Sequence, residues 1–495
     1  MGCPAKSYRE FARCRSQANP CVTPLVEHLG RGPGTPSTII VLDYSRNGPL
    51  TPTSRSVAEA ELANLLNATS ASAIQGRVLL VENIRPNLIS LLGALLDIDP
   101  VFFAGHIATD YGDIEKAPAP PSIALFPSQI AERGYLHLHF QRVFDMGTSE
   151  DFKGAAYALK TESNTPRNIR LLPPLSGRQL ALARANCSIL LKQIRDSWIC
   201  LILVDPPTTT IVEKGQGSGG RKGYPSEPLH GGFEDFAQRA SFTSFTSTPN
   251  DPLLWNKRSM LNSLLYYFRH QPPGFSTTAQ PSILSLGYYP TRVALAEWVI
   301  YIHLLSRYFK YYEYSLHDIQ TRLHDSDIVD LQRWRRRCMQ SRRKLRLLRA
   351  FIEHWLPHEA DKQPWDLVLR DVDDVLWHLE HYSRSLEQMI PVATSMVQLH
   401  DSQHAMLETA NVSRLTFIAL VFVPLSWVAS LFSMSDHYSP GGERFWVYFA
   451  TALPVLVVVL LLSALQWGQL AEKLKGTRRL LRERVRGQKT GGRLP

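Results

Sequence analysis

Two long apolar runs near the C-terminus place the strongest constraint on how this chain can fold. Residues 415–432 and 445–467 contain no charged side chain over 18 and 23 residues. As helices with a rise of ~1.5 Å per residue, they would reach roughly 27 and 34 Å, enough to cross a hydrocarbon core of ~30 Å. Only 12 residues link them, too few for a domain. The pattern therefore predicts a hairpin of two transmembrane helices.

The rest of the chain has the composition of a protein part that lies in water. Charged residues make up 20% of the 495 residues, and the mean hydropathy is −0.14. The six cysteines show no CxxC spacing, which argues against a thiolate zinc site and against a disulfide framework. This usage suits a reducing cytosol.

The basic residues near the second apolar run predict the orientation in the membrane. Residues 471–495 hold nine basic and two acidic side chains, whereas the loop between the runs holds one Arg, Asp436 and Glu443. The positive-inside rule then places both termini in the cytoplasm and the loop outside. A basic tail beside a span favours anionic lipid headgroups over nucleic acid as its partner. We expect a multi-pass protein of the plasma membrane rather than of an internal membrane.

Shifts in composition and periodicity divide the chain into predicted segments. Apolar runs at 38–43, 78–81, 135–144 and 198–204 read as strands, so 37–207 is expected to form an α/β cytosolic domain. The other segments are a disordered N-terminus (1–36), a flexible insertion rich in Gly, Ser, Thr and Pro (208–252), a helical cytosolic part (253–413), the two-helix transmembrane domain (414–467) and a basic cytosolic tail (468–495).

A heptad pattern precedes the first apolar run. Its positions, mostly apolar, are spaced alternately by 4 and 3 residues, which favours a left-handed helical bundle. They are Val375, Leu379, Tyr382, Leu386, Met389, Ala393, Met396, His400, Gln403, Leu407 and Ala410. Pro391 falls inside the pattern and should bend the helix or locally break its hydrogen-bond ladder. One long stalk helix is therefore predicted to run from the cytosol through the bilayer, and several copies around an axis could enclose a pore.

A strongly basic segment lies within the helical part. Residues 331–349 contain nine Arg or Lys and no acid. Such a run is typical of a solvated helix face. The alternative is a basic surface near the inner leaflet or around a cation path.

The C-terminal residues resemble a known family. The segment 414–434 reads RLTFIALVFVPLSWVASLFSM, and 440–449 reads PGGERFWVYF. Both resemble the CorA-type magnesium transporters, in their fungal CorA-like branch, as does 79–107 in the α/β part. The resemblance implies a homopentamer with an αβα cytosolic domain, in which the stalk helix continues into the pore-lining first span. It also implies conduction of Mg²⁺, and sometimes Co²⁺ or Ni²⁺, with no enzymatic reaction and no cofactor besides the transported ion.

The family's selectivity motif is altered in this chain. Members close the first span with Gly-Met-Asn, where this sequence has Ser433, Met434 and Ser435. Ser offers a shorter and weaker acceptor than the Asn carbonyl, and it makes a turn with positive φ costlier than Gly does. Capture of a divalent ion could shift to a ring of Asp436 and Glu443. The alternative is that these acids only keep the loop polar.

Polar residues of the stalk and first span are candidate pore-lining groups. Ser426 and Thr416 are hydroxyls within the span, although such hydroxyls usually bond back to the backbone. His400 and Gln403 would face the axis of a helical bundle, just inside the membrane. His400 and His404 also have the i, i+4 spacing of a zinc site, but no third ligand or general-base Glu accompanies them.

These observations predict a divalent cation transporter that conducts through an oligomeric pore lined by the first transmembrane helix. The alternative is a membrane-anchored scaffold or regulatory protein of the same fold that has lost transport, as the replaced Gly and Asn would allow.

Overall fold

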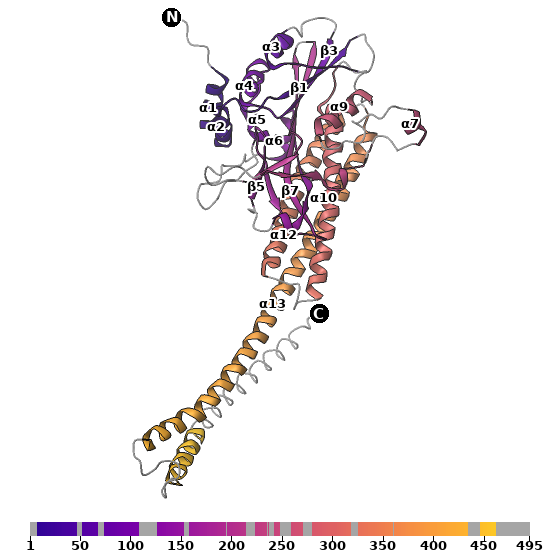
Figure 1. Ribbon diagram of the computed structural model, residues 1–495. Helices are drawn as coiled ribbons and strands as arrows, with labels where there is room; N and C mark the ends of the chain where they lie inside the picture. Colours follow the sequence, from indigo (N-terminus) through magenta and orange to yellow (C-terminus); the bar gives the residue numbers. More distant parts are fainter. Residues whose placement is uncertain are drawn as a thin grey trace, which may run out of the picture. The chain divides into compact units, whose positions relative to one another are not determined.

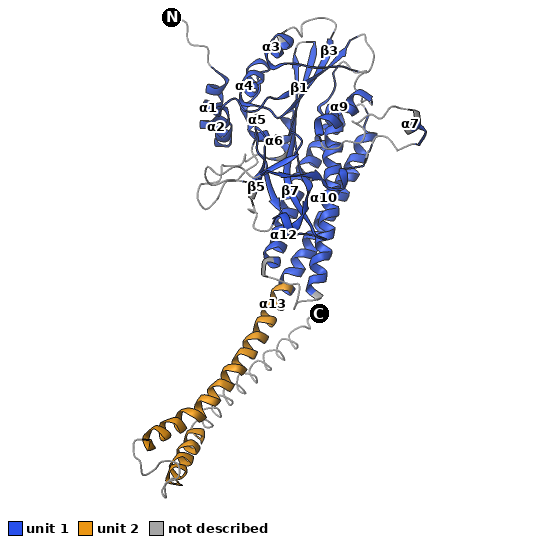
Figure 2. Cartoon of the chain, viewed as in Figure 1, with its two compact units in different colours: residues 1–318, 324–392 blue, residues 319–323, 393–495 orange. Residues whose placement is uncertain are grey.

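The computed structural model describes most of the chain outside several loops and the C-terminus. The described residues are 7–46, 52–67, 74–107, 126–152, 158–194, 196–213, 223–234, 236, 242–247, 259–270, 280–317, 325–359, 361–433 and 446–461. The chain divides into two compact units (Figures 1 and 2). Unit 1 comprises Met1–Asp318 and His324–Val392, and unit 2 comprises Ile319–Leu323 and Ala393–Pro495.

Unit 1 is built on one mixed sheet of eleven strands. Their order is β10-β9-β5-β6-β7-β8-β3-β1-β2, and β4 pairs with β7 and β11. The strands are β1 (Thr38–Ser45), β2 (Thr53–Ser56), β3 (Ile74–Glu82), β4 (Tyr135–Thr148), β5 (Ala158–Thr161), β6 (Asn168–Leu171), β7 (Arg178–Ile194), β8 (Ser197–Val204), β9 (Thr210–Glu213), β10 (Gly223–Pro225) and β11 (Glu227–Pro228). Of the described pairings, β3 with β8 is parallel and the others are antiparallel.

The centre of the sheet is apolar on both faces because helices cover both. All eight residues of β8 are buried, so the predicted central strand at 198–204 is confirmed. On one face, α4 (Pro86–Leu95) and α5 (Pro100–Ile107) share a core with β1, β3 and β8. On the other face, α9 (Met260–His270) and α10 (Ile283–His317) contact β3, β4 and β7 (Figure 1). Strands covered on both sides read as continuous hydrophobic runs, which is why the sequence revealed them.

The predicted disorder of residues 1–36 is wrong for most of that segment. It forms α1 (Tyr8–Ala18), a 3₁₀ turn at Pro20–Val22 and α2 (Thr23–Leu29). The Tyr8 hydroxyl donates to the Ile98 carbonyl at 2.8 Å, which ties α1 to the link between α4 and α5.

Local signals also favour the N-terminal helix. Ser7 caps α1 through a capping box: the Glu10 amide donates to the Ser7 hydroxyl, and the Ser7 amide donates to the Glu10 carboxylate. This arrangement satisfies two amides that the helix itself leaves unpaired. Because few apolar residues stand among many polar ones, composition alone suggested disorder.

The predicted flexible insertion at 208–252 is wrong at its start. Residues 210–213 and 223–228 form β9, β10 and β11, so the sheet extends beyond the predicted boundary at 207. Ile211 and Tyr224 are buried in a second apolar core, where the Tyr224 ring stacks on Phe152 with centroids 4.8 Å apart. Residues 214–222 lie outside the described residues.

The part of the chain expected to be helical contains long helices. They include α12 (Asp325–Trp355) and α10, which begins seven residues before Pro290. The stalk is α13 (Gln363–Phe432). The shorter elements are α3 (Glu59–Asn67), α6 (Pro127–Glu132), α7 (Phe242–Ser247) and 3₁₀ turns at Ser149–Phe152, Leu229–Gly231 and Leu356–His358.

Candidate pore element and buried polar cluster

The stalk prediction is confirmed as one continuous helix. α13 runs for 70 residues through Pro391 and Pro424, so neither proline ends it. At its start, the Gln363 amide donates to the Asp361 carboxylate at 3.2 Å. At its end, the Ser433 amide donates to the Ala429 carbonyl at 2.9 Å.

The heptad positions of α13 fall into two classes. Val375, Leu379, Leu386 and Ala393 are at most 1% exposed. Further along, Met396 and His400 are half-buried, while Gln403, Leu407 and Ala410 are exposed. The same spacing therefore continues onto a surface that a single chain leaves uncovered, and the predicted helical bundle there stays a prediction.

The C-terminal part of α13 has the length and composition of a membrane span. Its most apolar 18-residue window has a mean hydropathy of 2.2, and 6% of that window is buried. The second run is helical over residues 446–461, which is 16 described residues. One described helix is thus long and apolar enough to span, and the two-span arrangement stays a prediction.

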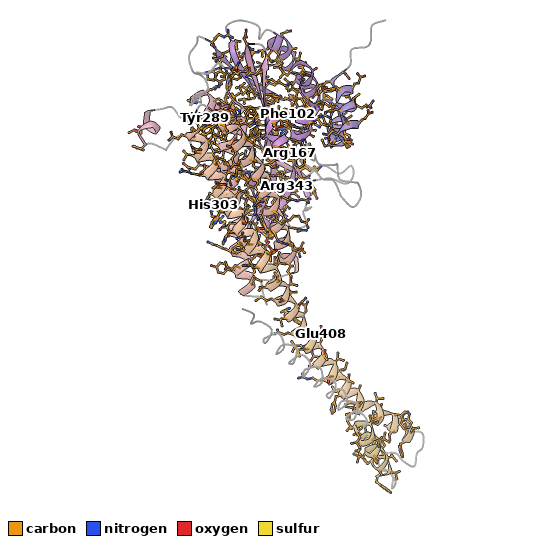
Figure 3. All side chains as sticks on the ribbon, turned by 180° about the vertical axis from the view of Figure 1, so that it is seen from behind. Phe102, Arg167, Tyr289, His303, Arg343 and Glu408 are labelled. Carbon is orange, nitrogen blue, oxygen red and sulfur yellow. The ribbon has the colours of Figure 1, made fainter. Side chains whose placement is uncertain are left out.

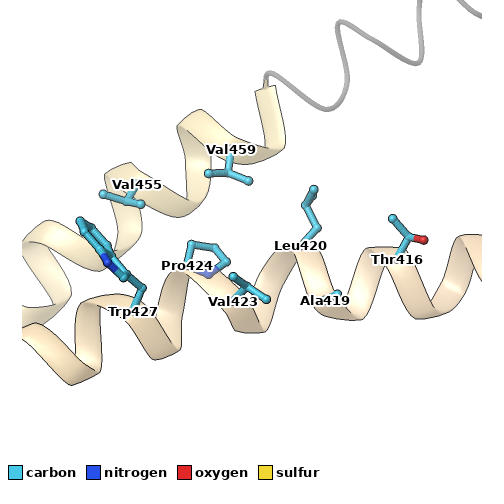
Figure 4. Close-up of a pocket in the computed structure, with 8 residues that line it drawn as sticks. All are labelled: Thr416, Ala419, Leu420, Val423, Pro424, Trp427, Val455 and Val459. Carbon is cyan, nitrogen blue, oxygen red and sulfur yellow. The ribbon is translucent and has the colours of Figure 1, made fainter.

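In unit 2, the two apolar helices form an apolar groove. Its volume is about 590 Å³, and it is lined by Thr416, Ala419, Leu420, Val423, Pro424 and Trp427 of α13 and by Val455 and Val459 of the second helix (Figure 4). Beside the end of α13, the Phe432 ring packs edge-on against Tyr448, with centroids 5.9 Å apart.

The hydroxyl groups of these helices bond to their own backbone. Thr416 donates to the Val412 carbonyl at 2.8 Å, and Ser426 donates to the Val423 carbonyl at 2.9 Å. Such bonds remove the cost of placing a hydroxyl in an apolar surrounding. Both side chains are exposed, but Thr416 lines the groove beside the second helix and Ser426 is not among the groove residues.

The predicted selectivity residues are only partly visible. Ser433 is exposed in the turn that closes α13. Met434, Ser435, Asp436 and Glu443 lie outside the described residues, so their role stays a prediction.

The pair His400 and His404 lies on one side of α13, with ring centroids 4.6 Å apart. Among the described residues, no group of three or more His, Cys, Asp or Glu side chains is placed to hold a metal ion. His400 and His404 are therefore two neighbouring imidazoles on one helix.

Unit 1 contains a buried polar cluster that the sequence did not reveal. Arg167 donates three hydrogen bonds to the Asp205 carboxylate, at 2.6 to 3.0 Å, and its Nη1 donates to the His106 carbonyl at 3.0 Å (Figure 3). Asp205 also accepts from the Asn186 amide at 2.8 Å. The carboxylate and guanidinium are both at least 90% buried, so each compensates the charge of the other in place of water.

Two histidines share one hydroxyl beside this ion pair. The Nδ1 atoms of His106 and His137 lie 2.8 and 2.7 Å from the Ser188 hydroxyl. Burial and the charge of Arg167 hold the pKa of His106 well below its usual range, and burial lowers the pKa of His137 to about 4. Both imidazoles are therefore neutral at physiological pH, and the cluster serves the core of unit 1 rather than an exposed site.

One family model matches the C-terminal part of the chain. The family model described as CorA-like Mg2+ transporter protein matches residues 299–467. A search of curated proteins finds no significant match.

Two solved structures are similar at low identity. The complete structure of the CorA magnesium transporter from Methanocaldococcus jannaschii has 10% identity and a TM-score of 0.37, and the match covers 86% of this chain and 96% of that chain. The full-length CmaX protein has 13% identity and a TM-score of 0.36, with 88% and 98% covered. At these scores the two structures define neither the fold nor the function of this chain. The family match covers residues 299–467, which hold α12, the whole of α13 and both apolar runs, so the similarity to CorA-like Mg²⁺ transporter proteins is shown for this part of the chain.

Proposed function

We propose that this protein is a divalent cation transporter of membranes, with Mg²⁺ as its ion. One observation carries the proposal: within the range that matches the family model, α13 ends in an uncharged apolar window of which a single chain buries only 6%. A soluble protein seldom exposes such a contiguous apolar surface, whereas a bilayer would cover it. Members of this family are transporters rather than enzymes, and we propose no covalent chemistry here.

The pore in this proposal forms from several copies of the chain. One α13 and one partner helix cannot enclose a water-filled path, so the exposed heptad positions would pack against other copies. A homopentamer is the assembly that the family resemblance implies. Within it, Ser426 is the better candidate for a pore-lining hydroxyl, because Thr416 lines the groove beside the second helix. His400 and Gln403 would face the axis at the cytosolic end.

The proposed filter lies at the end of α13, where Ser433, Met434 and Ser435 replace the Gly-Met-Asn of the family. Hydrated Mg²⁺ keeps its water, so such a filter acts by offering acceptors to that water. Asp436 and Glu443 would raise the local cation concentration at the mouth. The spans would place both termini in the cytoplasm, with the basic tail at anionic headgroups of the plasma membrane. We assign the altered filter to the fungal branch of the family.

The test compares filter variants in proteoliposomes with an internal Mg²⁺ dye at a set voltage. Asp436→Asn with Glu443→Gln should raise the Mg²⁺ concentration for half-maximal entry by several-fold, since two carboxylates per subunit are neutralised. Ser433→Gly with Ser435→Asn should increase entry. Unchanged entry in both variants would remove these residues from the filter.

A second candidate function is a transport-inactive scaffold of the same fold. The replaced Gly and Asn at Ser433 and Ser435 favour it. It predicts an assembled oligomer without Mg²⁺ entry in the wild-type chain, and no gain of entry in the Ser433→Gly/Ser435→Asn variant.

A further inference from the structure

The basic run of α12 carries two columns of arginine residues, one paired with acids of α13 and one exposed. The first column is Arg335, Arg342 and Arg349, spaced by seven residues. The three guanidinium groups form ion pairs with Glu387, Glu380 and Asp373 of α13, at 2.7, 2.9 and 2.9 Å. The acids are also spaced by seven residues, in the opposite direction. The pairing is therefore an antiparallel ladder between two helices.

The second column lies on the outer face of α12. Arg336, Arg343 and Arg346 are exposed, and none of them makes a hydrogen bond or ion pair with any residue that the structure describes. Figure 3 marks Arg343 on this helix. Met339, between the arginines, is 54% exposed. These four residues are spaced by 3, 4 and 3 positions, so they share one face of the helix. The opposite face holds the buried Trp334, Cys338, Ser341 and Leu345.

This outer stripe has the composition of a contact surface. Arginine and methionine are enriched at protein interfaces, because guanidinium groups bind carboxylates in a bidentate way and methionine adapts to its partner. The stripe contains no acid that would neutralise it from within.

We propose that the stripe of Arg336, Met339, Arg343 and Arg346 docks an acidic α-helix of a partner protein, with carboxylates at heptad spacing. The stripe and such a helix would have complementary charges at the seven-residue repeat that already pairs α12 with α13. The inner column of the same helix is neutralised by an antiparallel helix whose acids recur every seven residues, roughly 10.5 Å apart. The outer stripe presents the same chemistry at the same repeat. An extended nucleic acid would be expected to use aromatic side chains among the arginines, and this stripe has none.

The experiment uses the full chain in detergent micelles and a labelled synthetic 21-residue helical peptide with Glu at heptad a and d positions. A second peptide has the same composition with its Glu spread around the helix. Fluorescence anisotropy should show the heptad peptide binding about tenfold more tightly than the spread one, and more weakly as salt rises. The variant Arg336→Glu/Arg343→Glu should lose this preference.

A matched control makes the same charge change elsewhere. Arg13 and Arg370 are exposed on α1 and α13, so Arg13→Glu/Arg370→Glu should keep the preference for the heptad peptide. Equal affinity for the two peptides, no binding of either, or equal loss in both double variants would overturn the proposal. An oligonucleotide that displaces the peptide at equal charge concentration would instead assign the stripe to nucleic acid. None of these outcomes depends on Mg²⁺ entry.

Discussion

Single buried residues set much of the behaviour of unit 1. His28 is 1% exposed, and neither of its ring nitrogens has a hydrogen-bond partner among the described residues. Burial, helped by Arg31, lowers the pKa of His28 to about 4. A protonated imidazole at this place would be an unpaired buried charge, which is costly.

We predict that His28 makes unit 1 less stable in mild acid. The unfolded chain has a His pKa of ~6.5, so it binds more protons than the folded chain between pH ~6.5 and ~4. The free energy of unfolding therefore falls as the pH drops through this window, and His28 has no such effect above it. Between pH 7.5 and pH 5, the melting temperature of the His28→Leu variant should fall less than that of the wild-type chain. The exposed His303→Leu is the control, and an identical pH dependence in both variants would contradict the prediction.

The Arg167–Asp205 pair predicts a second residue-scale effect. Arg167→Met should lower the free energy of unfolding by about 3–5 kcal/mol, because it leaves the buried Asp205 carboxylate without its charged partner. The double variant Arg167→Met/Asp205→Leu should recover a large part of that loss. Denaturant unfolding of the full chain measures both, and a double variant less stable than the single one would argue against this account.

At the scale of elements, the sequence revealed segments in which consecutive or regularly spaced residues lie in the same environment. The strands at 78–81 and 198–204 are uninterrupted apolar runs, and the heptads of α13 repeat one spacing. It missed α1 and α2, because their apolar residues are few. It missed the polar cluster for another reason: His106, His137, Arg167, Ser188 and Asp205 come from five segments that meet only in the fold.

The docking of α1 can be tested by filling one glycine position. A Cβ at Gly93 would lie 2.3 Å from Cζ of Tyr8, closer than real contacts allow. Gly93→Ala should push Tyr8 and α1 off α4, and proteases should then cleave residues 8–29 at least several-fold faster. A Cβ at Gly32 would meet no atom within 4 Å, so Gly32→Ala should leave the cleavage rate unchanged. Equal rates in the two variants would show that α1 does not depend on this contact.

The faces of the apolar part of α13 lead to another element-scale prediction. In a background lacking Cys3 and Cys14, Ser426→Cys should react with a hydrophilic thiol reagent and lose Mg²⁺ entry, because Ser426 lies off the groove. Thr416→Cys, which lies in the groove, should react at least several-fold more slowly. The reverse order of rates would place the other face of α13 at the pore.

At the scale of the whole molecule, one helix belongs to both parts of the chain. α13 contributes buried heptad positions to unit 1 and an uncovered apolar surface to unit 2. Apolar patterning was enough to predict this helix and the apolar window at its end, which is long enough to span a membrane. The filter residues after Ser433 were predicted only from the family resemblance, because a short polar loop carries no periodic signal of its own.

The proposed transport can be measured as Mg²⁺ entry into sealed vesicles that contain the assembled wild-type protein. With an internal dye and a fixed inside-negative voltage, we expect entry that saturates with external Mg²⁺ and increases with the voltage. Entry no faster than into protein-free vesicles, from an oligomer shown to be correctly assembled and inserted, would contradict the proposed transport.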